Sequence, residues 1–117
     1  MKTILVADDV DINFLLLQIY LKREFNVLRA HDGVEAVDVF KTQSPDLILM
    51  DCKMPNMDGL EATRIIHGLA PELPVIMQSA YAFAEDKERA AEAGSIDFLV
   101  KPVTKQALLD MIAKYLK

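Results

Sequence analysis

The sequence has little that would suit a disulfide-bonded, membrane-spanning or nucleic-acid-binding protein. Its only cysteine is Cys52, which excludes an internal disulfide framework and favours a reducing compartment. No apolar run is long enough to cross a bilayer, and no N-terminal stretch has the pattern of a signal peptide. The net charge is -5 without a basic cluster, so direct binding of nucleic acid is not expected. We therefore expect a soluble, cytoplasmic domain that does not bind a membrane.

What the chain does contain is enough apolar material for one core. Hydrophobic residues make up 52% of its 117 residues, which indicates a folded globular domain and argues against a disordered tail. This length suits one core but not two. We expect residues 1–117 to form one domain, with no effector domain within these residues.

Short apolar runs alternate with helical patterns along the whole chain. The expected strands are 3–7, 26–30, 46–51, 75–79 and 96–100. The first expected helix is capped by Asp11 or Asn13 and ends near Arg23. The second runs from Gly33 to Ser44, and the third runs from 60 to 67 with Gly68 as its C-terminal cap. The last two are 84–93 and 108–116. Strict alternation predicts an α/β fold with a parallel sheet and helices on both faces. These local patterns do not fix the strand order.

The helix expected over 84–93 differs from the others in its apolar positions. All of them are alanines, so this helix has little hydrophobic area to bury. We expect it to be among the less firmly held elements of the fold.

Polar residues follow four of the five expected strands, where parallel strands end at the same edge of the sheet. They are Asp8, Asp9, Asp51, Ser79 and Lys101. Two like charges about 4 Å apart cost on the order of 4 kcal/mol at an effective dielectric of about 20. Three carboxylates beside one lysine therefore need another cation, and hard oxygen ligands favour Mg²⁺.

This set of groups predicts phosphoryl transfer to an aspartate. A carboxylate can act as a nucleophile and form an acyl phosphate. Lys101 and the Ser79 hydroxyl are placed to contact the phosphoryl oxygens, whose charge such a site must neutralise. Because no His, Cys or second base is placed for hydrolysis, a stable covalent mark is the expected product.

The order and spacing of these residues resemble the receiver domain of two-component response regulators over essentially the whole chain. The residues that carry the resemblance are Asp8-Asp9, Asp51, Met54-Pro55, Asp58-Gly59, Ser79-Ala80 and Lys101-Pro102. The segment 50–64 is most similar to receivers attached to hybrid histidine kinases. The resemblance implies a flavodoxin-like, doubly wound (βα)5 fold with strand order 2-1-3-4-5. It also implies a cis Lys101–Pro102 bond.

The resemblance further implies a signalling switch in a two-component system or phosphorelay, and not an enzyme beyond its own phosphorylation and dephosphorylation. Asp51 would accept the phosphoryl group from a histidine kinase or a histidine phosphotransfer domain. Asp9 and Asp51 would bind Mg²⁺ directly, with Mn²⁺ as an alternative. Asp8 would bind the metal through water, and the main-chain carbonyl of Lys53 would complete the protein ligands.

Ser79 and Phe98 would form the switch that reports phosphorylation. Ser79 would move toward the phosphoryl group and Phe98, which is often a tyrosine in the family, would turn inward. This movement would change the surface formed by the helix 84–93, the strand 96–100 and the last helix. Self-association or an output domain would use that surface. Lys53 and Tyr81 would tune the lifetime of the phosphoryl group.

Other interpretations of these residues remain. A metal-dependent aspartyl phosphatase needs an acid/base residue two places after its nucleophile, where this chain has Lys53. A flavin-binding protein needs a phosphate cradle, where this chain has Asp8 and Asp9. A receiver used only for docking would not need the acidic set. Phe98 could be a core residue, and Cys52 is expected to be inert.

Overall fold

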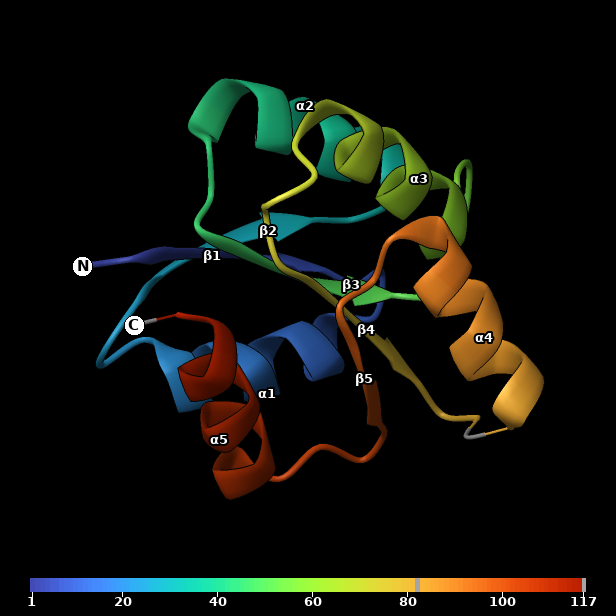
Figure 1. Ribbon diagram of the computed structural model, residues 1–117. Helices are drawn as coiled ribbons and strands as arrows, with labels where there is room; N and C mark the ends of the chain where they lie inside the picture. The colour runs from blue at the N-terminus through green and yellow to red at the C-terminus, as the bar shows by residue number, and fades with distance from the viewer. Residues whose placement is uncertain (82, 117) are drawn as a thin grey trace.

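The fold is a single five-stranded parallel sheet with helices on both faces (Figure 1). The computed structural model describes residues 1–81 and 83–116. The strands are β1 (Thr3–Ala7), β2 (Asn26–Ala30), β3 (Leu47–Asp51), β4 (Val75–Ser79) and β5 (Asp97–Val100). Their order is β2-β1-β3-β4-β5, and every neighbouring pair is parallel. This confirms the flavodoxin-like fold and its strand order.

Two groups of helices cover the sheet. The helices are α1 (Asp11–Leu21), α2 (Gly33–Gln43), α3 (Gly59–Leu69), α4 (Ala84–Ala93) and α5 (Lys105–Tyr115). Figure 1 shows α1 and α5 on one face, and α2 and α3 on the other with α4 beside α3. None of the helices in the described part of the chain has the length and apolar character to span a membrane.

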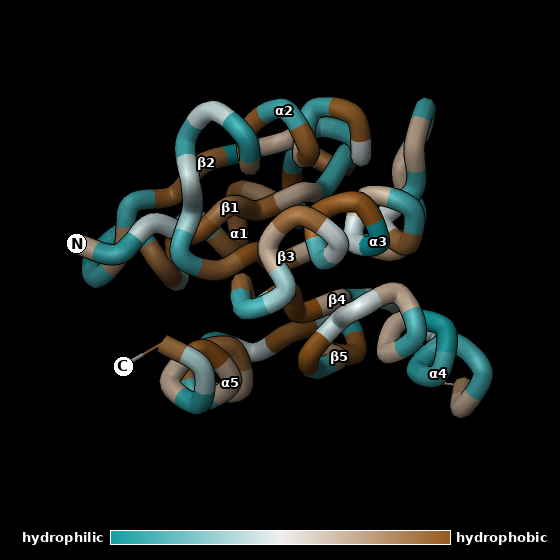
Figure 2. Tube along the Cα trace, turned by 45° about the horizontal axis from the view of Figure 1, so that its top comes forward, coloured by the Kyte–Doolittle hydropathy of each residue, from teal (hydrophilic) through white to brown (hydrophobic). Residues whose placement is uncertain are grey.

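The central strands are apolar throughout because both of their faces are covered. On β3, Leu49 packs in the cluster under α1 and α5, whereas Met50 packs in the cluster under α2, α3 and α4. The strands accordingly appear mostly in brown, the colour of hydrophobic residues, at the centre of Figure 2. β2 is only partly buried, which confirms its position at an edge of the sheet.

Two expected helix caps were wrong, and the last helix begins at Lys105, before the expected 108. Neither Asp11 nor Asn13 caps α1: Val10 occupies the cap position without a side-chain bond, and its N–H donates instead to Asp8 Oδ1 at 2.9 Å. Gly68 does not end α3, which continues to Leu69 with Ala70 as its cap. That end needs no left-handed residue, because Ala70 keeps a helical hydrogen bond to the carbonyl of Ile66.

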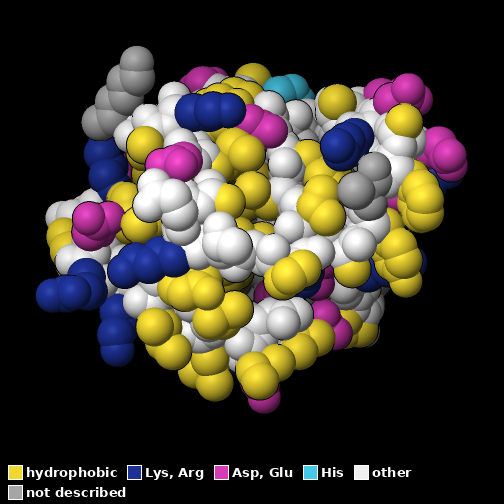
Figure 3. All heavy atoms as spheres, turned by 90° about the horizontal axis from the view of Figure 1, so that it is seen from below, with side chains coloured by type: hydrophobic (Ala, Val, Ile, Leu, Met, Phe, Trp, Pro, Cys, Tyr) yellow, Lys and Arg dark blue, Asp and Glu magenta, His cyan; other side chains and the backbone are white. Residues whose placement is uncertain are grey.

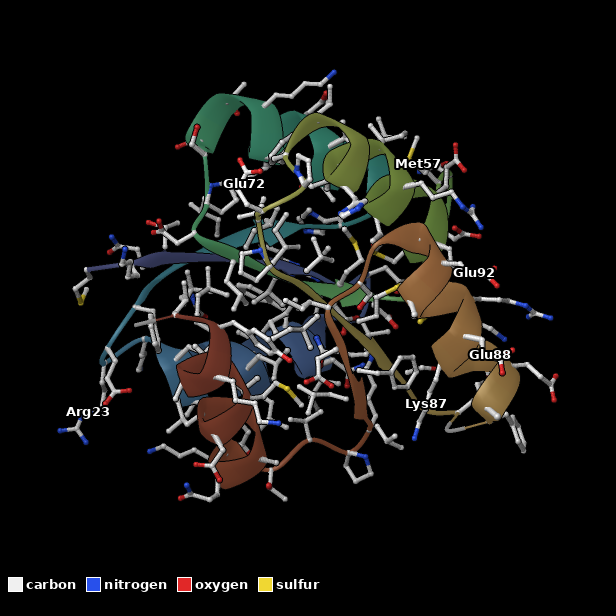
Figure 4. All side chains as sticks on the ribbon, viewed as in Figure 1. Arg23, Met57, Glu72, Lys87, Glu88 and Glu92 are labelled. Carbon is white, nitrogen blue, oxygen red and sulfur yellow. The ribbon has the colours of Figure 1, made fainter. Side chains whose placement is uncertain are left out.

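The apolar face of α4 is as thin as the sequence predicts. Only Ala90 and Ala93 are buried, whereas Lys87, Glu88 and Glu92 are exposed, and Glu88 and Glu92 point away from the sheet (Figure 4). α4 also begins without a side-chain cap, unlike α2, α3 and α5. Its lower stability stays a prediction.

Candidate functional site

The register of the sheet brings the predicted acidic residues together. Ala7 is paired with Met50, so Asp8 follows β1 at the level of Asp51 at the end of β3. The carboxylate groups of Asp8, Asp9 and Asp51 each offer an oxygen, and these three oxygens lie within 4.8 Å of one another. The sequence prediction of a convergent acidic cluster is confirmed in its geometry.

Lys101 enters the same cluster from the far end of the chain. Its Nζ lies 3.2 Å from Asp8 Oδ2 and 3.4 Å from Asp51 Oδ2. Asp8 is 0% exposed and Asp51 is 8% exposed, whereas Asp9 is open to solvent. Lys101 precedes Pro102 through a cis peptide bond, as the resemblance implied.

The charges of this cluster do not balance within the protein. Three carboxylates face one ammonium group, and at least two of the carboxylates are largely removed from water. Oxygen donors with a negative excess are the set that Mg²⁺ binds in proteins. The residues present therefore fit the predicted metal ion.

Burial is the largest influence on the Asp51 carboxyl. It raises the pKa of Asp51 above its ordinary value of 3.8, because the charged form loses hydration. The Lys101 ammonium group opposes this, the Asp8 carboxylate adds to it, and the N–H of Lys53 lowers the pKa through a hydrogen bond. A cation bound beside Asp51 would favour its ionised, nucleophilic form.

The loop after β3 folds closely over the backbone of Asp51. The N–H of Gly59 donates to the carbonyl of Cys52 at 3.0 Å. A Cβ at Gly59 would overlap the carbonyl oxygen of Asp51, so only glycine fits at this position. This close approach places the backbone of Lys53 beside the acidic cluster.

Arg29 on β2 supports the site, although no sequence pattern pointed to it. Its Nη2 donates to the backbone carbonyl of Asp8 at 3.2 Å and pairs with Asp11 Oδ1 at 2.8 Å. The guanidinium group also lies over the ring of Phe14, 4.7 Å from its centroid. Arg29 therefore anchors the loop that carries the acidic pair.

Ser79 lies at the end of β4 next to Lys53 and Tyr81. Its Oγ accepts a hydrogen bond from the N–H of Tyr81 at 3.1 Å, and the residue is buried. The three residues line one surface cavity of about 330 Å³. Within it, Lys53 Nζ lies 4.8 Å from the centroid of the Tyr81 ring. The two residues expected to tune the phosphoryl lifetime thus contact each other.

Phe98 and Cys52 lie beside the cluster without entering it. Phe98 is partly buried and packs against the core under α2, α3 and α4. Burial raises the pKa of the Cys52 thiol to about 11, with the Asp51 carboxylate adding to the effect. The thiol is therefore neutral at physiological pH, as expected of an inert cysteine.

Comparison with known proteins points to one family. The family described as response regulator receiver domain matches residues 4–113. The sensor histidine kinase RcsC of Salmonella typhi is 42% identical over 96% of the chain, which spans only 12% of that kinase. The chemotaxis protein CheY of Halobacterium salinarum is 35% identical, with 98% of the chain and 97% of CheY covered. Sporulation initiation phosphotransferase F of Bacillus subtilis is 30% identical, with coverage of 98% and 93%.

Solved structures give the same answer for the fold. Chemotaxis protein CheY4 of Vibrio cholerae superposes with a TM-score of 0.94 at 26% identity, and 99% of each chain is covered. The receiver domain of the sensor histidine kinase PA1611 of Pseudomonas aeruginosa superposes with a TM-score of 0.91 at 32% identity, covering 97% of this chain and 96% of that one. That structure has a magnesium ion coordinated in its active site cleft.

Proposed function

Because the chain belongs to the family of response regulator receiver domains, whose general function is a phosphorylation-dependent switch, we propose that Asp51 is its phosphoacceptor. The observation that carries this assignment is the position of Asp51. Its carboxylate is buried, lies in the acidic cluster and is 3.4 Å from Lys101 Nζ. Asp8 shares these three properties, but it is 0% exposed and accepts a hydrogen bond from the N–H of Val10, whereas the 8% exposure of Asp51 leaves that residue open to a phosphoryl donor.

The phosphoryl group would come from a phosphohistidine of a histidine kinase or a histidine phosphotransfer domain. An Asp51 carboxylate oxygen forms a bond to phosphorus, the P–N bond breaks, and its electron pair leaves with the imidazole. Mg²⁺, held by Asp9 and Asp51 directly, by Asp8 through water and by the Lys53 carbonyl, would neutralise charge on the phosphoryl oxygens.

Lys101 and Ser79 would hold the product. Lys101 Nζ already lies beside an oxygen of Asp51, so a new phosphoryl oxygen can become its partner. The Ser79 oxygen accepts a bond from Tyr81, which leaves its hydroxyl hydrogen free to donate. Movement of Ser79 toward the phosphate would let Phe98 turn inward and shift the surface formed by α4, β5 and α5. We propose that self-association or an output domain uses that surface.

Lys53 and Tyr81 would set how long the phosphate lasts. They contact each other in the cavity that Ser79 also lines. The pair would then lie in the path of a water molecule that hydrolyses the acyl phosphate, and its packing would control the slow loss of the phosphoryl group that the domain itself promotes.

The exposed side of α1 suits the partner that delivers the phosphate. Four apolar side chains lie exposed there: Ile12, Leu15, Leu16 and Ile19. Figure 3 views the molecule from the side of α1 and α5 and shows the hydrophobic side chains on that face. α1 begins two residues after Asp9, so a partner helix packed on this face would hold its phosphohistidine at the acidic cluster.

We propose that residues 1–117 act as one cytoplasmic receiver domain.

Intact-mass measurement tests the assignment of Asp51. With Mg²⁺ and acetyl phosphate, the wild-type domain should gain one phosphoryl group and Asp51→Asn should gain none. Removal of Mg²⁺ with a chelator should also prevent the gain. Equal labelling of Asp51→Asn would reject the assignment, and no labelling of the wild type would favour a docking domain. Rapid turnover of a phosphate ester would instead favour the phosphatase.

A further inference from the structure

Gln78 is a buried amide in β4, between the apolar residues Val75–Met77 and Ser79. It is 1% exposed, and Nε2 has no hydrogen-bond partner among the residues that the structure describes. In register it pairs with Asp51 on one side and with Leu99 on the other. Because Ile76, two residues earlier, packs under α1 and α5, the Gln78 side chain faces that same side.

An unpaired buried donor is costly, and an apolar side chain of similar size would avoid the cost at this position. Few such groups occur in native structures, and each calls for an explanation. Gln78 adds nothing to the core that a leucine would not. The amide is therefore best explained by an acceptor that reaches it from outside the chain.

A cavity of about 270 Å³ provides the access for such an acceptor. Gln78, Asp8 and Lys101 supply polar lining from the ends of the strands, and Asn13 of α1 adds a second amide. Leu16 and Leu17 of α1 form one wall, and the remaining lining residues are Ala80, Pro102 and Val103. This cavity shares no lining residue with the one beside Ser79. Nε2 is closed off by surrounding protein atoms, and a half-turn about the last side-chain bond of Gln78, which exchanges the two ends of its amide, would present the N–H donors to the cavity.

The charges around the cavity limit what can bind there. The ammonium of Lys101 is already shared between Asp8 and Asp51, so the polar side of the cavity is not an anion site. The leucine and valine walls favour an apolar body, and the Gln78 amide supplies a donor for one oxygen. We propose that this cavity binds a small, neutral, mainly apolar molecule whose carbonyl oxygen accepts a hydrogen bond from Gln78.

Such a ligand would act on the phosphorylation site. Asp8 and Lys101 belong both to the cavity and to the acidic cluster, so occupancy changes the surroundings of both. By linkage, a ligand that alters Mg²⁺ affinity must have its own affinity altered by Mg²⁺ to the same degree. The cavity thereby gives the receiver a chemical input besides phosphorylation, and its binding can be measured without phosphorylation.

Binding can be followed in the full chain by ¹H–¹⁵N NMR with benzamide as the probe. Benzamide is neutral and has an apolar ring and a carbonyl oxygen. At millimolar concentrations it should produce saturable shifts of the Gln78 side-chain amide and of the Val103 backbone amide. Toluene, which lacks the acceptor, should bind about fivefold more weakly, the effect of losing one hydrogen bond. Benzoate keeps an acceptor but is an anion, and it should also bind more weakly because the Lys101 ammonium is already paired with Asp8 and Asp51.

Two variants separate this site from non-specific binding. Gln78→Leu should remain folded and should bind benzamide and toluene equally well. Arg23→Gln lies in a different cavity, with Tyr20 and Lys105, and should leave the benzamide curve unchanged. The proposal is overturned if benzamide gives no saturable shift at Gln78, if toluene binds the wild type as well as benzamide does, or if Gln78→Leu retains the preference for benzamide. If Gln78→Leu does not fold, Gln78→Met provides the same comparison.

Discussion

Helix α1 follows the acidic pair Asp8 and Asp9, and helix α4 lines the cavity beside Ser79, but the two helices are held to the sheet in opposite ways. α1 buries the large side chains Phe14, Leu17 and Leu21, and still leaves apolar residues on its outer side. α4 buries only two alanines and turns a charged side outward. We therefore predict that α1 is firmly held and presents an apolar outer surface, whereas α4 is less firmly held and presents a charged outer surface.

This difference assigns the two helices different tasks. A surface that receives a partner must keep its shape while the phosphohistidine is positioned, and α1 has the buried side chains for that. An element that reports phosphorylation must move for a modest input of free energy. α4 has little packing to break, so it can shift when Ser79 and Phe98 change position.

Truncation of one buried side chain in each helix gives the largest expected contrast. Leu17→Ala should lower the free energy of unfolding by about 2–5 kcal/mol, because it leaves a cavity in the core under α1. Ala90→Gly in α4 should cost only about 1 kcal/mol, mainly through helix propensity. Urea unfolding measures both. Similar losses in the two variants would contradict the proposed contrast.

The outer side of α1 should matter for phosphotransfer and not for folding. Ile12 is 74% exposed, so Ile12→Ser should change stability by less than about 0.5 kcal/mol. It should slow transfer from a phosphohistidine partner by roughly tenfold, as loss of an interface anchor does. Labelling by acetyl phosphate, which needs no docking surface, should be unchanged. Equal slowing with both donors would place the defect in the site itself.

The smallest expected effect concerns the hydrogen bond that links α5 to β5. Tyr115 Oη donates to Asp97 Oδ2 at 2.7 Å, and this bond raises the pKa of Tyr115 above its ordinary value of 10.0. A raised pKa means that the stabilisation is complete below about pH 10 and is lost as the pH rises through the folded-state pKa. Wild type should therefore lose stability above pH 10 more steeply than Tyr115→Phe. Parallel pH curves would show that the bond does not hold α5.

The sequence predicted those parts of the molecule that depend on local pattern. Short apolar runs locate the strands, and the polar residues at their ends include Asp51 and Lys101. The family resemblance, and not the periodicity, supplied the strand order. Periodicity also could not show that Leu15 and Ile19 are exposed, because α1 is apolar nearly all round.

Contacts between distant segments were the part that could not be predicted. Arg29 is an ordinary strand residue until the fold places it under the backbone of Asp8. The Gln78 amide matters because α1 and the segment after β5 leave a cavity beside it. The position of Val10 at the start of α1 likewise follows from a bond to Asp8, a side chain that the sequence assigns to the acidic cluster.

Beryllofluoride, which imitates the phosphoryl group on Asp51, tests the contrast between the two helices directly. We predict that adding it with Mg²⁺ shifts the backbone amide signals of Ser79, Phe98 and α4, while those of the buried side of α1 around Leu17 and Leu21 stay in place. Unchanged signals in α4, or equal changes in α1 and α4, would contradict the account.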